Sequence, residues 1–365
     1  MWRRYRRAAF LLQAAALTGL PFLYVNGESA LRFDISGLKL HFFGTVLWIN
    51  EFHLVLAGFV FLVLLFAAVT VVFGKVWCGW LCPQTVLLEL AGWMSAGVSP
   101  KPRPVVERAV LLLLSAVVSF TAISYFVPPS EAAARLFGGG TVTAFFAVTG
   151  GAVYAVTAVL GRSFCRSVCP CSMLQSALFD GDTMVIAYER GRGCTGCNRC
   201  VEVCPVGLDI RRGAARECIA CAECIDACAT AGSGRDGVLP VGYRGRVKRP
   251  KALVFAAVAL SSGVAFILLL SARPALDFTV TRDARQAAGG VNSYMYTVRN
   301  NRNERLRLRL SVDGPFELIG AAEMQIGPYE AGSGRVMVKA LDGAGMVVFV
   351  IEAGRTRIER RAGFL

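Results

Sequence analysis

The chain has 365 residues, of which 55% are hydrophobic and 18% charged, and its mean hydropathy is +0.53. A soluble domain is typically about 45–50% apolar and about 25% charged, so this composition excludes a single soluble globule and a disordered chain. The 39 Lys and Arg outnumber the 25 Asp and Glu and leave a net charge of +14. The positions of the basic residues decide whether that charge signals nucleic acid.

The counts of cysteine and histidine narrow the chemistry further. The chain has 13 cysteines, and an odd number excludes a framework made only of disulfides. Two histidines, His41 and His53, are too few for bis-histidine haem in a membrane or for histidine-rich zinc chemistry. No Cys-x-x-Cys-His string occurs, which excludes covalently attached c-type haem.

Five apolar segments predict membrane spans. Four of them belong to a polytopic α-helical membrane domain over residues 1–185, and the fifth lies beyond it. Residues 8–25 follow a cluster of arginines, and no small-residue cleavage site comes closely after them, which favours an uncleaved anchor over a signal peptide. Residues 54–73, 109–127, 141–160 and 252–271 are free of charge and have 19 or 20 residues each. A spanning helix needs about 20 apolar residues, so we expect about five spans.

The same motif follows the second and the fourth apolar segments. Residues 74–83 contain Cys78-x-x-x-Cys82-Pro, and residues 161–170 contain Cys165-x-x-x-Cys169-Pro. On a helix this spacing places both thiols of a copy on one face, and the proline fits the first position of a new helix. Cys82 and Cys169 would then stand at helix N-termini, where the helix dipole favours the thiolate.

Several roles are open for the four motif cysteines, Cys78, Cys82, Cys165 and Cys169. They form a copper(I)-type thiolate site, a redox dithiol pair or a further cluster, or they are helix-end cysteines that pack at the membrane surface. Cys171 lies two residues after Cys169. We interpret it as an ordinary small side chain, with a spare metal ligand as the alternative.

Residues 186–243 contain eight cysteines in two evenly spaced runs. Three cysteines at i, i+3 and i+6 hold one corner of a cubane, and the distant fourth ligand comes from the other run. The predicted ligands of the first [4Fe-4S] cluster are Cys194, Cys197, Cys200 and Cys228, and those of the second are Cys204, Cys218, Cys221 and Cys224. Zinc sites are the alternative, but they usually lack the third evenly spaced cysteine.

The last part of the chain differs from the rest in its pattern of apolar and polar residues. Residues 244–273 hold a basic flank and the fifth span, and residues 274–365 predict a small β-sandwich. Residues 305–310 alternate with period two, and residues 291–299 and 346–352 indicate further strands. Turns are expected at residues 300–303 and 342–343. This β-domain lacks cysteine and histidine, so we expect it to serve as a scaffold or docking module.

The basic residues indicate the orientation in the membrane. The predicted inner flanks hold fifteen Lys and Arg, namely Arg3, Arg4, Arg6, Arg7, Lys75, Lys101, Arg103, Arg108, Arg162, Arg166, Arg244, Arg246, Lys248, Arg249 and Lys251. The predicted outer loops hold three, namely Arg32, Lys39 and Arg135. The positive charge is therefore a topology signal, and nucleic acid is not an expected partner. All the cysteines then face the reducing cytoplasm, and the C-terminal β-domain lies outside it in the periplasm.

Several strings recur in one known family. Before the second motif these strings are residues 33–37, His41-Phe42-Phe43-Gly44 and residues 82–86 (Cys-Pro-Gln-Thr-Val). After it begins they are residues 165–170, 175–180, 182–183 and 217–221, and in the tail Asn292, Tyr296, Thr297 and Asn300. The chain resembles, over nearly its whole length, the FixG/CcoG family of membrane polyferredoxins, which are linked to maturation of cbb-type cytochrome c oxidases. That family usually has tyrosine where Cys171 stands.

The resemblance implies a bacterial inner-membrane protein with an immunoglobulin-like C-terminal domain. It also implies a possible cupric reductase that supplies copper(I) for oxidase assembly, with Cys78, Cys82, Cys165 and Cys169 as the thiols that handle copper. Expected partners are the lipid bilayer, a cytoplasmic electron donor, a copper chaperone or transporter, and oxidase assembly factors. The alternatives are a quinol-linked electron-transfer subunit of a respiratory complex and a non-catalytic assembly factor or redox sensor.

Overall fold

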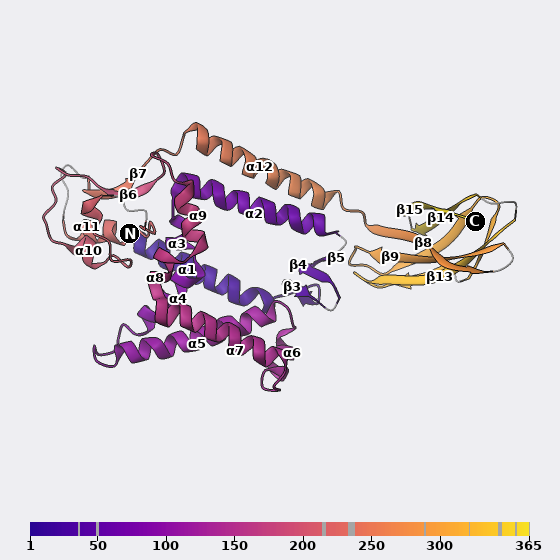
Figure 1. The fold of residues 1–365 in the computed structure, drawn as a ribbon, viewed down its shortest axis with the longest axis horizontal. Helices are drawn as coiled ribbons and strands as arrows, with labels where there is room; N and C mark the ends of the chain where they lie inside the picture. The colour runs from indigo at the N-terminus through magenta and orange to yellow at the C-terminus, as the bar shows by residue number, and fades with distance from the viewer. Residues whose placement is uncertain are drawn as a thin grey trace. The chain divides into compact units, whose positions relative to one another are not determined.

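The computed structural model describes residues 1–35, 37–48, 51–213, 217–232, 238–287, 290–320, 322–341, 345–354 and 356–364. The chain divides into two compact units. Unit 1 comprises Met1–Leu23, Leu31–Phe33 and Asn50–Leu269, and unit 2 comprises Tyr24–Ala30, Asp34–Ile49 and Leu270–Leu365. Each unit is drawn as a ribbon in Figure 1.

Unit 1 is built mostly from helices. In chain order they are α1 (Trp2–Gly19), η1 (Leu20–Phe22), α2 (Phe52–Phe73), α3 (Val76–Trp80), α4 (Pro83–Met94), α5 (Arg103–Ser124), α6 (Pro129–Arg135), α7 (Thr141–Tyr154), the π-helical η3 (Ala155–Leu160), α8 (Gly161–Ser167), α9 (Pro170–Leu178) and α12 (Pro250–Ser271). Within the described residues, four helical stretches are long and apolar enough to cross a membrane, namely α2, α5, Thr141–Leu178 and α12.

The first predicted span differs from the helix that forms. Helix α1 begins at Trp2, so it takes in the arginines at positions 3, 4, 6 and 7, and it ends at Gly19. Pro21 lies in η1, and Tyr24–Val25 forms strand β1. Because the helix combines four arginines with a short apolar part, it is not among the four candidates, and a fifth span over 8–25 stays a prediction.

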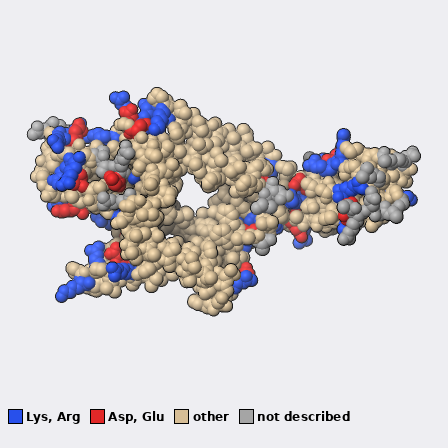
Figure 2. All heavy atoms as spheres, in the orientation of Figure 1, with Lys and Arg blue, Asp and Glu red and all other residues tan. Residues whose placement is uncertain are grey.

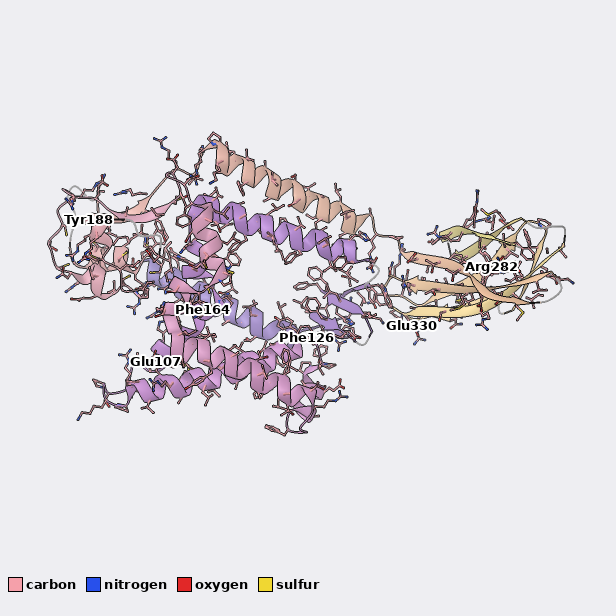
Figure 3. The ribbon with its side chains drawn as sticks, viewed as in Figure 1. Glu107, Phe126, Phe164, Tyr188, Arg282 and Glu330 are labelled. Carbon is pink, nitrogen blue, oxygen red and sulfur yellow. The ribbon has the colours of Figure 1, made fainter. Side chains whose placement is uncertain are left out.

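Charge and apolar surface are separated along the helices of unit 1. Figure 2 shows Lys and Arg gathered where α5 and α12 begin and over α10 and α11, with a band of uncharged atoms between the helix ends. Glu107 and Phe126, labelled in Figure 3, mark the charged and the aromatic end of α5. This separation is the surface that a lipid bilayer requires of a spanning helix.

A small ferredoxin-like module completes unit 1. Strands β6 (Val185–Tyr188) and β7 (Val241–Arg244) pair antiparallel and enclose α10 (Arg199–Glu202), η4 (Ile210–Arg212) and α11 (Glu223–Thr230). Its apolar core contains Ile186, Ile210, Ala222, Ile225 and Val241 together with several cysteines. The two cysteine runs thus lie between the strands of one hairpin.

Unit 2 contains a β-sandwich. One sheet has the order β12-β10-β14-β15 and the other β11-β13-β9-β8. Their bounds are β8 (Leu276–Ala287), β9 (Val291–Asn300), β10 (Leu306–Asp313), β11 (Phe316–Ile319), β12 (Glu323–Ile326), β13 (Ala331–Ala340), β14 (Met346–Ala353) and β15 (Thr356–Gly363). Side chains of both sheets, including Phe278, Tyr294, Leu310 and Phe349, share one buried core.

The strands expected in the tail are confirmed. In β10, Leu308 and Leu310 are buried while Arg307 and Arg309 are exposed, which is the alternation that the sequence shows. The turn expected at residues 342–343 lies outside the described residues. The immunoglobulin-like topology stays an expectation of the resemblance.

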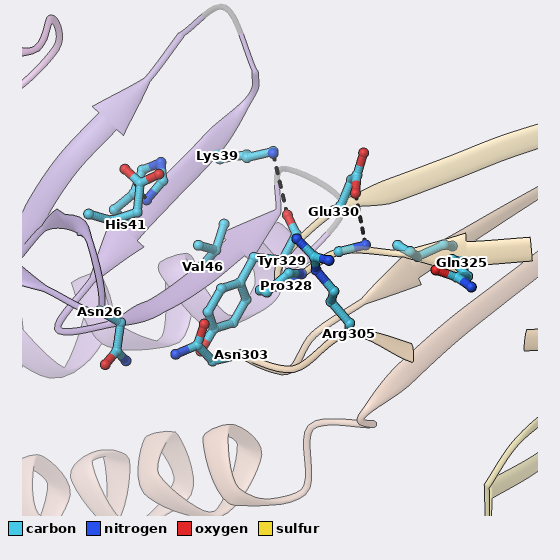
Figure 4. A pocket seen from close by; sticks show the side chains of 13 residues that line it. Asn26, Lys39, His41, Val46, Asn303, Arg305, Gln325, Pro328, Tyr329 and Glu330 are labelled. Carbon is cyan, nitrogen blue, oxygen red and sulfur yellow. Dashed lines mark hydrogen bonds and ion pairs between the residues drawn. The ribbon is translucent and has the colours of Figure 1, made fainter. Parts of the chain in front are cut away.

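Short strands also form within residues 24–48, namely β1 (Tyr24–Val25), β2 (Glu28–Ser29), β3 (Leu31–Asp34), β4 (Lys39–Phe42) and β5 (Thr45–Trp48). Strand β3 crosses the division between the units, and β4 pairs with β5 inside unit 2. There the Tyr329 hydroxyl donates to the Gly44 carbonyl at 2.8 Å, and Lys39 donates to the Tyr329 carbonyl at 3.4 Å. Figure 4 shows the cavity of about 620 Å³ beside these contacts.

Candidate iron–sulfur and thiol site

The two cysteine runs have the same backbone conformation. Gly196 and Asn198 in the first run have φ values of 73° and 60°, and Ala220 and Ala222 at the matching positions have 54° and 63°. Left-handed positions of this kind turn successive backbone N–H groups to one side, and such concavities hold anionic iron–sulfur groups. Alanine adopts this conformation at a cost, so its repetition in the second run indicates a geometry imposed by what the loop binds.

Backbone N–H groups also point at the sulfur atoms. The Leu208 N–H donates to the Cys204 sulfur at 3.3 Å. The Arg199 N–H lowers the pKa of Cys197 by hydrogen bonding to its sulfur. Hydrogen bonds of this type favour the thiolate, which is the form that ligates iron. Eight thiols, matched loops and inward N–H groups fit two [4Fe-4S] clusters, which supply single-electron transfer when they are bound.

The structure brings cysteines of the two runs together. Cys200 of the first run packs in the same core as Cys224 and Cys228 of the second. A small apolar cavity is lined by Cys200, Cys204, Cys218, Cys221 and Cys224. Within the described residues no three Cys, His, Asp or Glu side chains converge as ligands of one metal ion. The mixing of the runs is the pattern that crossed ligation requires.

The ends of the module differ in exposure. Of the predicted first-cluster ligands, Cys194 and Cys197 are exposed and Cys228 is buried, whereas the second-cluster ligands Cys221 and Cys224 are both buried. The first predicted cluster therefore has ligands at the surface, while the second is held by the interior of unit 1.

The first Cys-x-x-x-Cys-Pro motif, residues 74–83, packs directly on the loop that carries Cys218 and Cys221. Cys78 shares a buried cluster with Ile219 and Cys221. A Cβ atom on Gly79 would lie 2.2 Å from the Ile219 carbonyl oxygen and 3.1 Å from the Cys221 nitrogen, so this contact has room only for glycine. The Trp80 indole donates to the Ala220 carbonyl at 3.1 Å. The chain thus places one copy of the thiol motif against the predicted ligands of the second cluster.

The two copies of the motif have the same local structure. Each begins at a glycine with a left-handed φ, 62° at Gly74 and 50° at Gly161, where a preceding helical segment ends. Cys82 and Cys169 are the N-cap residues of α4 and α9, and a proline occupies the first turn of each helix. The predicted position of these two thiols at helix N-termini is confirmed. The extended conformation of both cysteines is the one that a following proline imposes.

Polar contacts join the two copies. The Cys78 thiol donates to Oε1 of Gln175 at 3.4 Å, and Lys75 donates to the Ser172 hydroxyl at 2.9 Å. Gln84 Nε2 donates to the Gly161 carbonyl at 3.0 Å. In Figure 3, Phe164 marks α8 of the second copy, and its carbonyl accepts the N–H of Cys169 at 2.9 Å. Segments about 90 residues apart in the sequence therefore meet at one place.

Burial sets the protonation of the first copy. Burial, together with the neighbouring Cys82, raises the pKa of Cys78 to about 12. Burial lowers the pKa of Lys75, and the nearby Cys78 and Glu217 oppose that shift. Cys78 is therefore a neutral thiol at neutral pH in the absence of a bound metal. The thiolate character expected for Cys82 and Cys169 stays a prediction.

Comparison with known proteins agrees with this geometry. A family model described as a 4Fe-4S dicluster domain matches residues 192–235, and one described as a 4Fe-4S binding domain matches residues 54–102 and 141–183. The RdxA protein of Cereibacter sphaeroides is 28% identical, over 82% of this chain and 76% of its own length. The FixG nitrogen fixation protein of Rhizobium meliloti is 26% identical, over 84% of this chain and 75% of its own length.

The chain is thus similar to FixG and its relatives over most of its length. The ferredoxin-type protein NapH of Haemophilus influenzae is 26% identical over 41% of this chain and 56% of its own length. Together with the 4Fe-4S models and the apolar helices, these relatives establish a membrane-associated iron–sulfur electron-transfer protein.

Arg6 is a structural residue that the sequence pattern does not reveal. Its place among the inner-flank arginines marks it only as a topology signal, yet its side chain is 2% exposed. It donates to the Gly79 carbonyl at 3.0 Å, to Glu89 at 2.7 Å and to Glu223 at 2.6 Å. One guanidinium thus links α1, the first membrane motif and the ferredoxin helix α11.

A sequence signal for this network exists in α4. Glu89 is the only charged residue of the helix Pro83–Met94, and a carboxylate on such an apolar helix needs a buried partner. Burial alone would raise the pKa of Glu89, but Arg6 and Arg162 together hold it below its usual value. Arg162 reaches the same oxygen of Glu89 at 2.7 Å. Glu89 therefore joins the second membrane motif to the network.

A second buried arginine secures the start of α12. Arg249 is 7% exposed and pairs with Asp180, and its guanidinium also donates to the Thr183 hydroxyl at 3.2 Å. Lys251 lies 3.4 Å from the same carboxylate. The Asp180 and Thr183 positions, which carry part of the family resemblance, therefore connect the ferredoxin module to the last membrane helix.

Proposed function

We propose that this protein reduces copper(II) to copper(I) at the four motif thiols and supplies the copper(I) for assembly of a cbb-type cytochrome c oxidase. The observation that supports this proposal is the contact of Gly79 with Ile219 and Cys221. Because the first motif touches the loop that carries Cys221, a copper(II) ion held by its thiols would lie beside the second cluster and could accept an electron from it.

The chemistry of the thiols suits the substrate. Thiolate sulfur is a soft ligand that prefers copper(I) over harder cations, so a thiolate site stabilises the reduced product. Each copper(II) ion takes up one electron and becomes copper(I), with no atom transferred. Cys82 and Cys169 stand at helix N-termini, whose dipole favours a thiolate and so a positively charged ion beside it.

Substitution of the first cysteine pair tests this proposal. The Cys78→Ser, Cys82→Ser double variant should keep the absorbance and paramagnetic signals of both clusters and lose copper(II) reduction, measured with a copper(I)-specific chelator. Normal copper reduction in this variant would refute the proposal. The matched control is Cys171→Ser, because Gln84 occupies the equivalent position in the first copy and so no thiol is needed there.

We also propose the orientation that the basic residues predict. The ferredoxin module lies in the cytoplasm and the β-sandwich in the periplasm, where it docks a copper chaperone, a copper transporter or an oxidase assembly factor. Alkaline phosphatase fused after residue 365 should be active and the same enzyme fused at residue 190 should be inactive. The opposite pattern would invert the topology.

The similarity to NapH favours a second candidate function. In this alternative the protein is a ferredoxin-type electron-transfer subunit of a respiratory complex, and the thiol motifs take part in electron transfer instead of copper binding. Reduction of the clusters by a soluble quinol analogue, together with copper reduction too slow to account for oxidase assembly, would favour this candidate over the first.

A further inference from the structure

A basic cavity lies at the surface of the ferredoxin module. The cavity measures about 560 Å³ and is lined by residues of α1, α10 and α11, among them Arg3, Arg4, Arg7 and Arg199. Figure 2 shows basic side chains at this end of unit 1. Four guanidinium groups around one cavity create a positive potential that attracts an anionic partner.

Three carboxylates also line the cavity, namely Glu202, Glu223 and Asp226, and the last two are engaged within the protein. Asp226 accepts the backbone N–H groups of Trp2 and Arg3 at 3.1 and 2.7 Å. Glu223 holds the buried Arg6 at 2.6 Å. In the part of the chain that the structure describes, no carboxylate forms an ion pair with Arg4, Arg7 or Arg199. The Arg7 guanidinium lies over the Trp93 ring, 5.0 Å from its centroid, so Arg4 and Arg199 are the two that remain to meet a partner.

The cavity adjoins the exposed end of the electron path. Helix α10 carries Cys200, and α11 carries Cys228, both predicted ligands of the first cluster. The other two ligands of that cluster, Cys194 and Cys197, are exposed. The second cluster faces the membrane motif through Gly79 instead. An electron that enters at the first cluster would therefore start beside the cavity, and one that leaves from the second cluster would do so beside the thiol motif.

We propose that this basic cavity docks an acidic one-electron carrier protein of the flavodoxin or ferredoxin type. Each encounter moves one electron: the carrier is oxidised by one electron, the first cluster is reduced by one, and no atom is transferred. Carriers that donate single electrons match clusters that accept them singly, whereas hydride donors need a flavin between. Complementary charge raises the association rate of such partners. This proposal rests on the iron–sulfur electron-transfer role and not on copper.

Stopped-flow reduction of the full-length protein tests the docking site. The protein is placed in phosphatidylcholine nanodiscs, and bleaching of the clusters is followed with flavodoxin hydroquinone or with dithionite as reductant. The Arg4→Gln, Arg199→Gln variant should react with flavodoxin about tenfold more slowly at low salt, and added salt should remove the difference. Its reaction with dithionite should be unchanged, because a small reductant needs no docking surface.

Two further variants make the result specific. Arg4→Lys, Arg199→Lys should restore the rate with flavodoxin, since steering depends on charge and not on the shape of the guanidinium. Arg212→Gln removes one positive charge at a residue outside the cavity and should retain the wild-type rate. Copper is absent throughout, so failure of the copper proposal leaves this test intact.

Three outcomes would overturn the proposal. The first is equal flavodoxin rates for the wild type and the Gln variant. The second is a wild-type protein that flavodoxin hydroquinone does not reduce at all. The third is a loss of the arginine effect in nanodiscs that contain phosphatidylglycerol, which would assign the cavity to lipid headgroups.

Discussion

Gly79 shows how much one residue decides in this protein. Its missing side chain lets the first thiol motif touch the loop that holds Cys221. Glycine is often explained by unusual backbone angles, but here the reason is space, because an added Cβ would meet a backbone carbonyl that cannot move away without shifting a cluster ligand.

Gly79→Ala should therefore destabilise the protein by about 1–3 kcal/mol, the usual cost of overpacking, and should change the paramagnetic signal of the second cluster. Gly92→Ala is the matched control, since a Cβ there meets nothing within 4 Å. In a helix interior the control substitution should stabilise by about 0.5–1 kcal/mol. Equal thermal unfolding and equal spectra for the two variants would contradict the role given to Gly79.

Arg6 is the second residue with a large expected effect. Arg6→Gln leaves Glu223 without its buried partner, so the free energy of unfolding should fall by about 3–5 kcal/mol in thermal or denaturant unfolding. Arg4→Gln, on the same helix, should change it by less than about 0.5 kcal/mol. A small effect of Arg6→Gln would mean that Glu223 finds water instead.

The lowered pKa of Glu89 gives the pH dependence of this network a definite sign. A carboxyl group whose pKa is lower in the folded state than in the unfolded state stabilises the fold above its unfolded pKa. That stabilisation is fully present at neutral pH, and it is lost as the pH falls through the lowered value. The network is thus intact at neutral pH.

At the scale of elements, α2 and α12 pack through reciprocal contacts of glycine with phenylalanine. A Cβ on Gly263 would lie 2.8 Å from the Phe61 ring, and one on Gly58 would lie 3.1 Å from the Phe266 ring. Figure 1 shows the two helices side by side. Small residues at such positions allow membrane helices to approach closely, where packing is the main attraction.

Gly263→Leu should therefore separate α2 from α12 and lower the unfolding temperature in detergent. Gly151→Leu in α7 is the control, because an added Cβ there meets nothing within 4 Å. The two variants add the same apolar group to a predicted span, so a difference between them reports the packing. Equal unfolding temperatures would show that α12 is held by other contacts, such as Arg249 with Asp180.

At the scale of the whole molecule, the metal content decides how the cysteines are used. Two cubanes predict about eight iron atoms per chain in anaerobically purified protein. About twelve iron atoms would show instead that the four motif cysteines hold a further cluster, which would displace copper from them. Removal of the iron with a chelator under oxidising conditions should abolish electron transfer and leave the β-sandwich folded, as measured by circular dichroism, since its core contains no cysteine.

Local patterns in the sequence were sufficient for much of this protein. The spacing of the cysteines, the repeated Cys-x-x-x-Cys-Pro motif, four of the apolar spans and the period-two strand at Leu308 and Leu310 each depend on neighbours along the chain. Such patterns reflect helix and strand geometry directly, so they can be recognised without a fold. The extent of the first helix was less predictable, because its Arg6 is stabilised by the distant carboxylates of Glu89 and Glu223.

Only the tertiary structure decided which distant residues meet. Arg6 reaches Glu223 across 217 positions, and Gly79 touches a loop about 140 residues away, yet no local pattern marks either pairing. Burial is the physical reason, since an ion pair or a steric contact acquires its energy from the surroundings that enclose it. The sequence alone determined the chemistry of this electron carrier, and the packing of its segments determined the route that the electrons can take.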